Sequence, residues 1–186
     1  MIYSNTIFGN MAEKGSISLT AKQGSYLVGC LNLLGAIIAP IPVVMFPRKF
    51  LLFWGQLTMA ISLIMVAVCY NLNYDIAIIV FICVFILAFQ FSQGPIAWMY
   101  AAEVAVDTGL GICVLALYLS LLEKAITMEF MVHSSMGAPG MFYVLGGITL
   151  LGAVFIQVFI KETKGLTDVE KKRLFMPLDL IEAENK

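Results

Sequence analysis

The chain has 186 residues, of which 61% are hydrophobic and 12% are charged, and its formal net charge at pH 7 is −1. A soluble domain is about 45–50% apolar and about 25% charged, so this composition predicts an integral membrane protein. The absence of a basic excess argues against nucleic-acid binding. With four scattered cysteines and one histidine, the sequence has no zinc motif and no disulfide framework, and we expect no cofactor, no metal and no enzymatic activity.

Five apolar runs are long enough to cross a bilayer, because about 20 residues at a helical rise of 1.5 Å match the hydrocarbon thickness. The sequence therefore predicts an all-α bundle with spans at about 24–46, 51–70, 76–100, 109–128 and 139–160. Residues 1–8 are expected to be the tail of a further helix. Residues 161–186 form a charged tail, in which Thr167 and Glu170 predict a capping box and a short soluble helix.

Polar, proline and glycine residues mark particular places in these spans. Asn32 is the strongly polar residue in the middle of the first span, and Pro40 and Pro42 are predicted to disturb that helix towards its far end. A short loop, Pro47-Arg48-Lys49, is expected to follow. The fifth span carries three glycines that are available for close helix packing: Gly146, Gly147 and Gly152.

The end of the third span, residues 89–98, is unusually polar for its place in an apolar run. Gln90, Gly94 and Trp98 are spaced by four residues, so they share one face of a continuous helix. An amide, a small residue and an indole on one face suit a polar ring with apolar edges, such as a sugar. The alternative is that Gln90 and Gln93 only link neighbouring helices and that Trp98 anchors a membrane interface.

The positive-inside rule gives an orientation. Arg48, Lys49 and the tail from residue 161 hold eight of the eleven lysines and arginines. We therefore expect the C-terminus to be cytoplasmic, with loops 9–23, 71–75 and 129–138 on the outer side. Whether the membrane is the plasma membrane or that of an organelle stays open.

Four motifs occur in a fixed order along the chain: Tyr3-Ser4 with Ile7-Phe8, Arg48-Lys49, Gly94-Pro95-Ile96-Ala97-Trp98 with Ala102-Glu103, and Glu162-Thr163-Lys164-Gly165. With five spans between them, they resemble the C-terminal half of a sugar porter, in the glucose-transporter-like branch of the major facilitator superfamily. The resemblance implies that the five spans are helices eight to twelve of a twelve-helix fold, and that residues 1–160 are its C-terminal half-bundle.

The resemblance also implies a binding site for a monosaccharide. The residues that match its substrate-binding positions are Asn32, Phe89, Gln90, Gly94 and Trp98. The chemistry agrees, because an amide donates to and accepts from vicinal hydroxyls at once, while the apolar face of a sugar can lie against an indole.

The resemblance further implies a cytoplasmic gate, which is a salt-bridge cluster formed by Arg48, Lys49, Glu103 and Glu162. The chain departs from the family here: Val44 and Pro47 stand where relatives have an acid and a glycine, and residues 104–110 lack the arginine that relatives have. The alternative is that these are plain loop charges, since an exposed ion pair contributes only about 0–1 kcal/mol.

The functional expectation is a hexose-type transporter that works by alternating access. Such transporters bind substrate between two halves, and this chain matches one half, so we expect it to be an incomplete chain that is inactive alone. It would need the missing N-terminal half or a partner chain. The alternative is a non-transporting membrane subunit or scaffold derived from a sugar porter. Neither the sugar nor the mode of coupling follows from the sequence.

Overall fold

The computed structural model describes residues 21–105, 107–133, 137–167 and 170–171. The elements of this part are all helices: α2 (Ala21–Ile38), α3 (Pro40–Met45), α4 (Arg48–Asn71), α5 (Asp75–Phe91), α6 (Gln93–Val104), α7 (Asp107–His133) and α8 (Gly137–Phe159). They provide five spans long and apolar enough to cross a membrane. The predicted all-α class with five spans is thus confirmed, whereas the expected helix tail at residues 1–8 lies outside the described residues.

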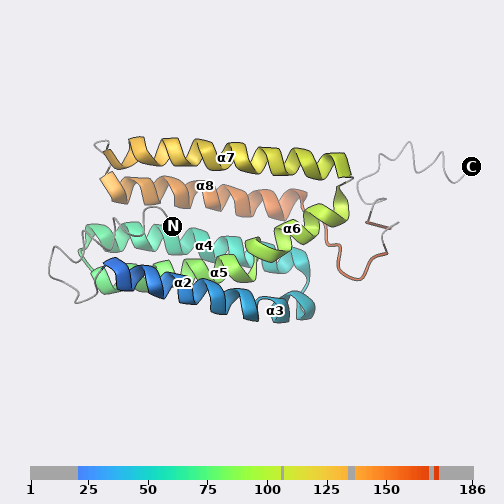
Figure 1. Cartoon of the computed structure of the whole chain (residues 1–186), viewed down its shortest axis with the longest axis horizontal. Helices are drawn as coiled ribbons and strands as arrows, with labels where there is room; N and C mark the ends of the chain where they lie inside the picture. Colours follow the sequence, from blue (N-terminus) through green and yellow to red (C-terminus); the bar gives the residue numbers. More distant parts are fainter. Residues whose placement is uncertain (1–20, 106, 134–136, 168–169, 172–186) are drawn as a thin grey trace, which may run out of the picture.

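The helices lie side by side in the spatial order α7, α8, α4, α5 and α2 (Figure 1). α4 is central, because it packs against α8 on one side and against α5 on the other. α2 packs on α5, and α7 packs on α8. The α3–α4 turn, the end of α6 and the end of α8 lie at the same end of the bundle (Figure 1), which we call the Arg48 end.

Two clusters of buried apolar side chains hold α4 to its neighbours. The larger one joins α4, α5 and α8 near the end opposite Arg48, and its buried members are Leu63, Val66, Ala67, Cys69, Ile78, Met141 and Phe142. The smaller cluster lies towards the Arg48 end, where Leu52 of α4, Ile96 of α6 and Ile156 of α8 pack together. Because both clusters include α4 and α8, this helix pair forms the centre of the packing.

Two of the five spans are interrupted near prolines. The first span changes from α2 to α3 at Ala39, directly before Pro40, as the prolines predicted. The span expected as one helix over 76–100 is instead divided at Ser92 into α5 and α6. Pro95 has no N–H to donate to the carbonyl four residues earlier, so the helical ladder is broken at this place. At the break, the Ala88 carbonyl accepts both the Ser92 backbone N–H at 3.1 Å and the Ser92 hydroxyl at 2.7 Å.

The α3–α4 connection is shorter than the sequence indicated. Arg48 and Lys49 were expected in a loop, but they form the first turn of α4, which follows Pro47 in an extended conformation (φ −59°, ψ 143°). The first N–H groups of a helix have no partner within it. A carboxylate from the far end of the chain satisfies them here, and this long-range contact was not visible in the sequence.

The beginning of the charged tail shows the contacts of the predicted capping box. The Thr167 amide and hydroxyl donate to Glu170 Oε2 at 2.8 and 2.7 Å. These bonds hold the pKa of Glu170 below its ordinary value. These two bonds are therefore present at neutral pH and weaken only as the pH falls through that lowered pKa. The short helix expected after it lies almost entirely outside the described residues.

Close helix packing uses two of the three glycines predicted for it. A Cβ at Gly146 would lie 2.8 Å from Ile64 Cγ1 and 3.5 Å from the Ala60 carbonyl oxygen of α4. A Cβ at Gly152 would lie 2.6 Å from Gln56 Nε2. Gly147 has nothing within 4 Å of such an atom, so the prediction for this glycine is wrong. α8 therefore presents a narrow glycine face to α4.

Gly146→Ala and Gly147→Ala form a matched pair that tests this packing. We expect Gly146→Ala to lower the free energy of unfolding by about 1–3 kcal/mol, because the β-branched Ile64 has little room to move. Gly147→Ala should leave it unchanged or raise it by up to about 1 kcal/mol, since alanine favours the helix. Unfolding in detergent measures both variants, and equal losses of stability would contradict the assigned α4–α8 contact.

Candidate functional site

Asn32 of α2 and Gln90 of α5 lie against each other. Gln90 Nε2 donates to the Asn32 backbone oxygen at 2.8 Å and to Asn32 Oδ1 at 3.2 Å. Asn32 Nδ2 donates to the Val28 oxygen of its own helix at 2.8 Å. Both amides are half-buried. The structure thus brings together two of the predicted substrate residues, which are 58 positions apart in the chain.

Gly94 and Phe89 lie next to Gln90 of this amide pair. A Cβ at Gly94 would lie 3.3 Å from Gln90 Oε1 and 3.8 Å from the Phe89 ring. The helix break at Ser92 therefore does not separate Gln90 from Gly94. Trp98 follows one turn later on α6, and its side chain is 46% exposed, much as Phe89 is at 44%. Gly94 and Phe89 thus lie next to the amide pair, whereas Trp98 is placed only by its position on α6.

The amide pair keeps hydrogen-bonding capacity for a ligand. Within the described chain, neither Gln90 Oε1 nor the second Nδ2 hydrogen of Asn32 takes part in a hydrogen bond. One acceptor and one donor therefore stay free at neighbouring positions. Two adjacent hydroxyl groups need this combination, because each hydroxyl both donates and accepts.

A second chain of amides links three helices. Gln93 Nε2 of α6 donates to Gln56 Oε1 of α4 at 2.7 Å, and Gln56 Nε2 donates to the Thr149 carbonyl of α8 at 3.2 Å. Gln93 thus links neighbouring helices, as the alternative interpretation expected. Gln56 was not among the predicted residues, because a single glutamine in an apolar run carries no sign of its partner.

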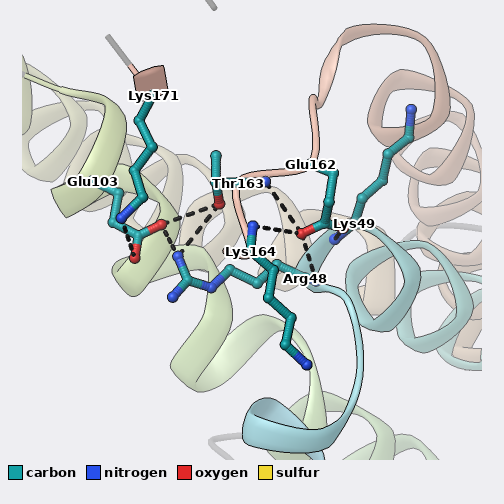
Figure 2. Close-up of polar contacts among 7 residues, drawn as sticks. All are labelled: Arg48, Lys49, Glu103, Glu162, Thr163, Lys164 and Lys171. Atoms are coloured by element: carbon teal, nitrogen blue, oxygen red, sulfur yellow. Dashed lines mark hydrogen bonds and ion pairs between the residues drawn. The ribbon is translucent and has the colours of Figure 1, made fainter. Parts of the chain in front are cut away.

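The charged side chains at the Arg48 end form one cluster (Figure 2). The Arg48 guanidinium is paired with Glu103 at the end of α6, and Lys171 Nζ lies 3.5 Å from the other oxygen of Glu103. Thr163 lies between them: its hydroxyl donates to Glu103 Oε2 at 3.1 Å and accepts from Arg48 Nη1 at 3.3 Å. This threonine is fully buried.

Glu162 caps the beginning of α4. Its carboxylate accepts the backbone N–H groups of Arg48 at 3.0 Å and Lys49 at 2.9 Å. It also accepts the N–H groups of Thr163 and Lys164 at 3.1 and 3.0 Å. A negative charge at a helix N-terminus is favourable, because the helix dipole is positive there. One carboxylate therefore fixes the segment after α8 to the first turn of α4.

The four residues predicted as a cytoplasmic gate thus lie together, although their role as a gate stays a prediction. Lys49 joins through its backbone, while its ammonium group donates to the Gln157 carbonyl of α8 at 2.9 Å. Thr163 and Lys171 were not among the predicted residues. A threonine in a charged segment is expected to face water, and only its burial identifies it as the link between Arg48 and Glu103.

Comparisons with known proteins identify the relatives of this chain. A family model described as "Sugar (and other) transporter" matches residues 1–175. Sugar transport protein MST5 of Oryza sativa subsp. japonica is 24% identical over 89% of this chain and 34% of the relative. Facilitated trehalose transporter Tret1 of Anopheles gambiae is 26% identical over 87% of this chain and 22% of the relative.

A solved structure shares the fold. The inward-open conformation of the xylose transporter XylE from E. coli matches with a TM-score of 0.74 and 25% identity, over 94% of this chain and 42% of that one. The chain spans about a third of the length of MST5 and of a second relative, Sugar transport protein MST7 of Oryza sativa subsp. japonica. With five membrane-length spans and membrane transporters as relatives, it is an integral, multi-pass membrane protein. Since the family model covers nearly the whole chain, the chain belongs to the sugar transporter family.

Proposed function

We propose that this chain supplies one wall of a site for a hexose-type monosaccharide and takes part in its transport by alternating access. The observation that carries the proposal is the cluster of Asn32, Gln90 and Gly94, which leaves one amide acceptor and one amide donor free. Phe89 and Trp98 add half-exposed aromatic surface beside it. Family membership supports a transporter rather than an enzyme.

The exposed surface of α7 supports the proposal that this half needs a second half. No residue of its span Gly109–Met128 is buried, although the helix contains Glu123 and Lys124, both of them exposed. Lys124 lies four residues before the end of that span, or about 6 Å along the axis, so both charges are expected near the membrane interface rather than at the costly bilayer centre. A partner half that packs on α7 would cover the surface that this half leaves exposed.

The cluster at the Arg48 end is proposed as the cytoplasmic gate of this half. It joins the start of α4, the end of α6 and the segment after α8 through Arg48, Glu103 and Glu162. Both side chains of the Arg48–Glu103 pair are less than a fifth exposed. Such a pair is screened less by salt than an exposed one. The cluster therefore steadies one arrangement of these helices, and the C-terminus is cytoplasmic in this proposal.

A non-transporting membrane subunit is the second candidate, and the uncovered α7 favours it equally. Purification in mild detergent distinguishes the two functions. A partner at fixed stoichiometry, without sugar uptake, supports the subunit. For the transporter we expect no saturable hexose uptake by cells that express this chain alone, and recovery of uptake when it is paired with the six-helix N-terminal half of a related transporter.

The sugar site is tested by Asn32→Ala and Trp98→Ala in such a paired transporter. Each variant should weaken hexose binding about five- to tenfold, because each removes an interaction of about 1 kcal/mol. Asn71→Ala and Trp54→Phe are matched controls. Asn71 only bonds Tyr143 at the surface, and Trp54 lies on α4, so both should keep the affinity. Unchanged affinity in Asn32→Ala and Trp98→Ala, with normal expression, would show that the site is elsewhere.

The gate is tested by Thr163→Val, which keeps the shape of the side chain and removes the hydroxyl between Arg48 and Glu103. We expect the free energy of unfolding to fall by about 1–3 kcal/mol, because two hydrogen bonds to charged groups are lost, and amide exchange to become faster at residues 48–50 and 101–105. Thr58→Val is the control, because the Thr58 hydroxyl donates only to the Trp54 carbonyl of its own helix. Hydrogen–deuterium exchange measures both, and identical profiles would contradict a link through Thr163.

A further inference from the structure

An apolar groove of about 560 Å³ runs along α4 between α3 and α5. Its volume lies in the range of about 300–1,000 Å³ that small-molecule sites have. Nearly all of its walls are aliphatic or aromatic, and the residues that matter here are Phe46, Phe50, Trp54, Thr58 and Ala88. Gln90 is not among its lining residues, so the groove is separate from the sugar site described above.

The groove is nearly as long as one lipid leaflet. Its lining residues on α4 run from Phe50 to Thr58, which is eight residues or about 12 Å along the axis. One leaflet measures about 15 Å, half of the hydrocarbon thickness of about 30 Å. Phe46, Phe50 and Trp54 follow one another along the groove with ring centroids 6.0 Å apart, and about half of each side chain is exposed. Because Phe50 and Trp54 lie within a span long and apolar enough to cross a membrane, the groove opens to the acyl chains of one leaflet.

A positive charge without an acidic partner lies at the outer end of this groove. Lys164 is exposed, and its ammonium group donates to the carbonyl of Val44 at 2.7 Å, two residues before Phe46. In the described part of the chain, Lys164 forms no ion pair with a carboxylate. Glu162 accepts backbone N–H groups, and Glu103 is paired with Arg48 and Lys171. Both nearby acids are therefore already occupied.

From the groove and this charge, we infer a binding site for one anionic phospholipid of the leaflet at the Arg48 end. One acyl chain lies in the groove against Phe50 and Trp54, and the phosphate of the head group is held by Lys164. Charge complementarity selects the lipid: a zwitterionic head group gains less from an unpaired ammonium group than one with a net negative charge. The bound lipid would brace α3 against α4 beside the charged cluster.

The two tryptophans of the chain allow a direct test. In the Trp98→Phe variant of the whole chain, Trp54 is the single fluorophore, and it lines the groove. The variant is placed in vesicles of phosphatidylcholine with phosphatidylglycerol, and one lipid at a time carries bromine on its acyl chains. Bromine quenches indole fluorescence on contact. Brominated phosphatidylglycerol should bind at Trp54 about fivefold more strongly than brominated phosphatidylcholine, the effect of one lysine at an anionic surface.

Lys164→Gln in this background should abolish the preference, while Lys164→Arg should keep it. Lys124→Gln is the matched control, because Lys124 lies on α7 at the other edge of the bundle (Figure 1), and it should change nothing. In Trp54→Phe, where Trp98 reports instead, no preference is expected. The inference is overturned if both lipids quench Trp54 equally, if Lys124→Gln has the effect of Lys164→Gln, or if Trp98 shows the same preference.

Discussion

The hydrocarbon core of a bilayer contains no water that could bind a polar group, and this constraint shapes the bundle. Its amide side chains are therefore paired between helices. Gln93, Gln56 and the Thr149 carbonyl connect α6, α4 and α8, and Gln90 connects α5 to Asn32 of α2. These bonds lie on the helices that the apolar clusters already join to α4. Polar pairing thus fixes the rotation of each helix about its own axis, whereas the apolar surfaces alone would permit many rotations.

At the Arg48 end, charged groups rather than amides connect the helices. Glu162 closes the open N–H groups of α4, and Thr163 directly after it joins Arg48 to Glu103. Two neighbouring residues thereby hold three helix ends together. The helix ends opposite them have no comparable cluster among the described residues. The larger apolar cluster holds that opposite end, so charged groups join the helices at one end of the bundle and apolar packing joins them at the other.

The proposed sugar site and the proposed lipid site use different faces of the same helix, α5. Gln90 faces α2, whereas Ala88 lines the groove towards α4. The break at Ser92 lies between the two, and a Cβ at Gly55 of α4 would collide with the Ser92 side chain. The break at Ser92 thus packs directly against α4, close to both proposed sites. Sugar binding on one face and lipid binding on the other would therefore act on one rigid junction.

The sequence determined the parts of this protein that depend on local composition. Apolar runs of membrane length gave five spans, prolines marked the break at Ala39, and the order of four motifs identified the family. The resemblance to sugar porters implied that Arg48, Glu103 and Glu162 interact. Asn32 and Gln90 stood out by themselves, because strongly polar residues are few in apolar runs.

Tertiary structure decided what depends on partners far along the chain. Gln56 looks ordinary in the sequence, and Thr163 and Lys164 appear there only as parts of a family motif, so helix packing alone gives each its contact. The start of α4 at Arg48 depends on a carboxylate 114 residues away, and Gly146 differs from Gly147 only in facing α4. Local pattern fixes which segments become helices. The pairing of buried polar groups, which needs the neighbouring helix in place, fixes how those helices meet.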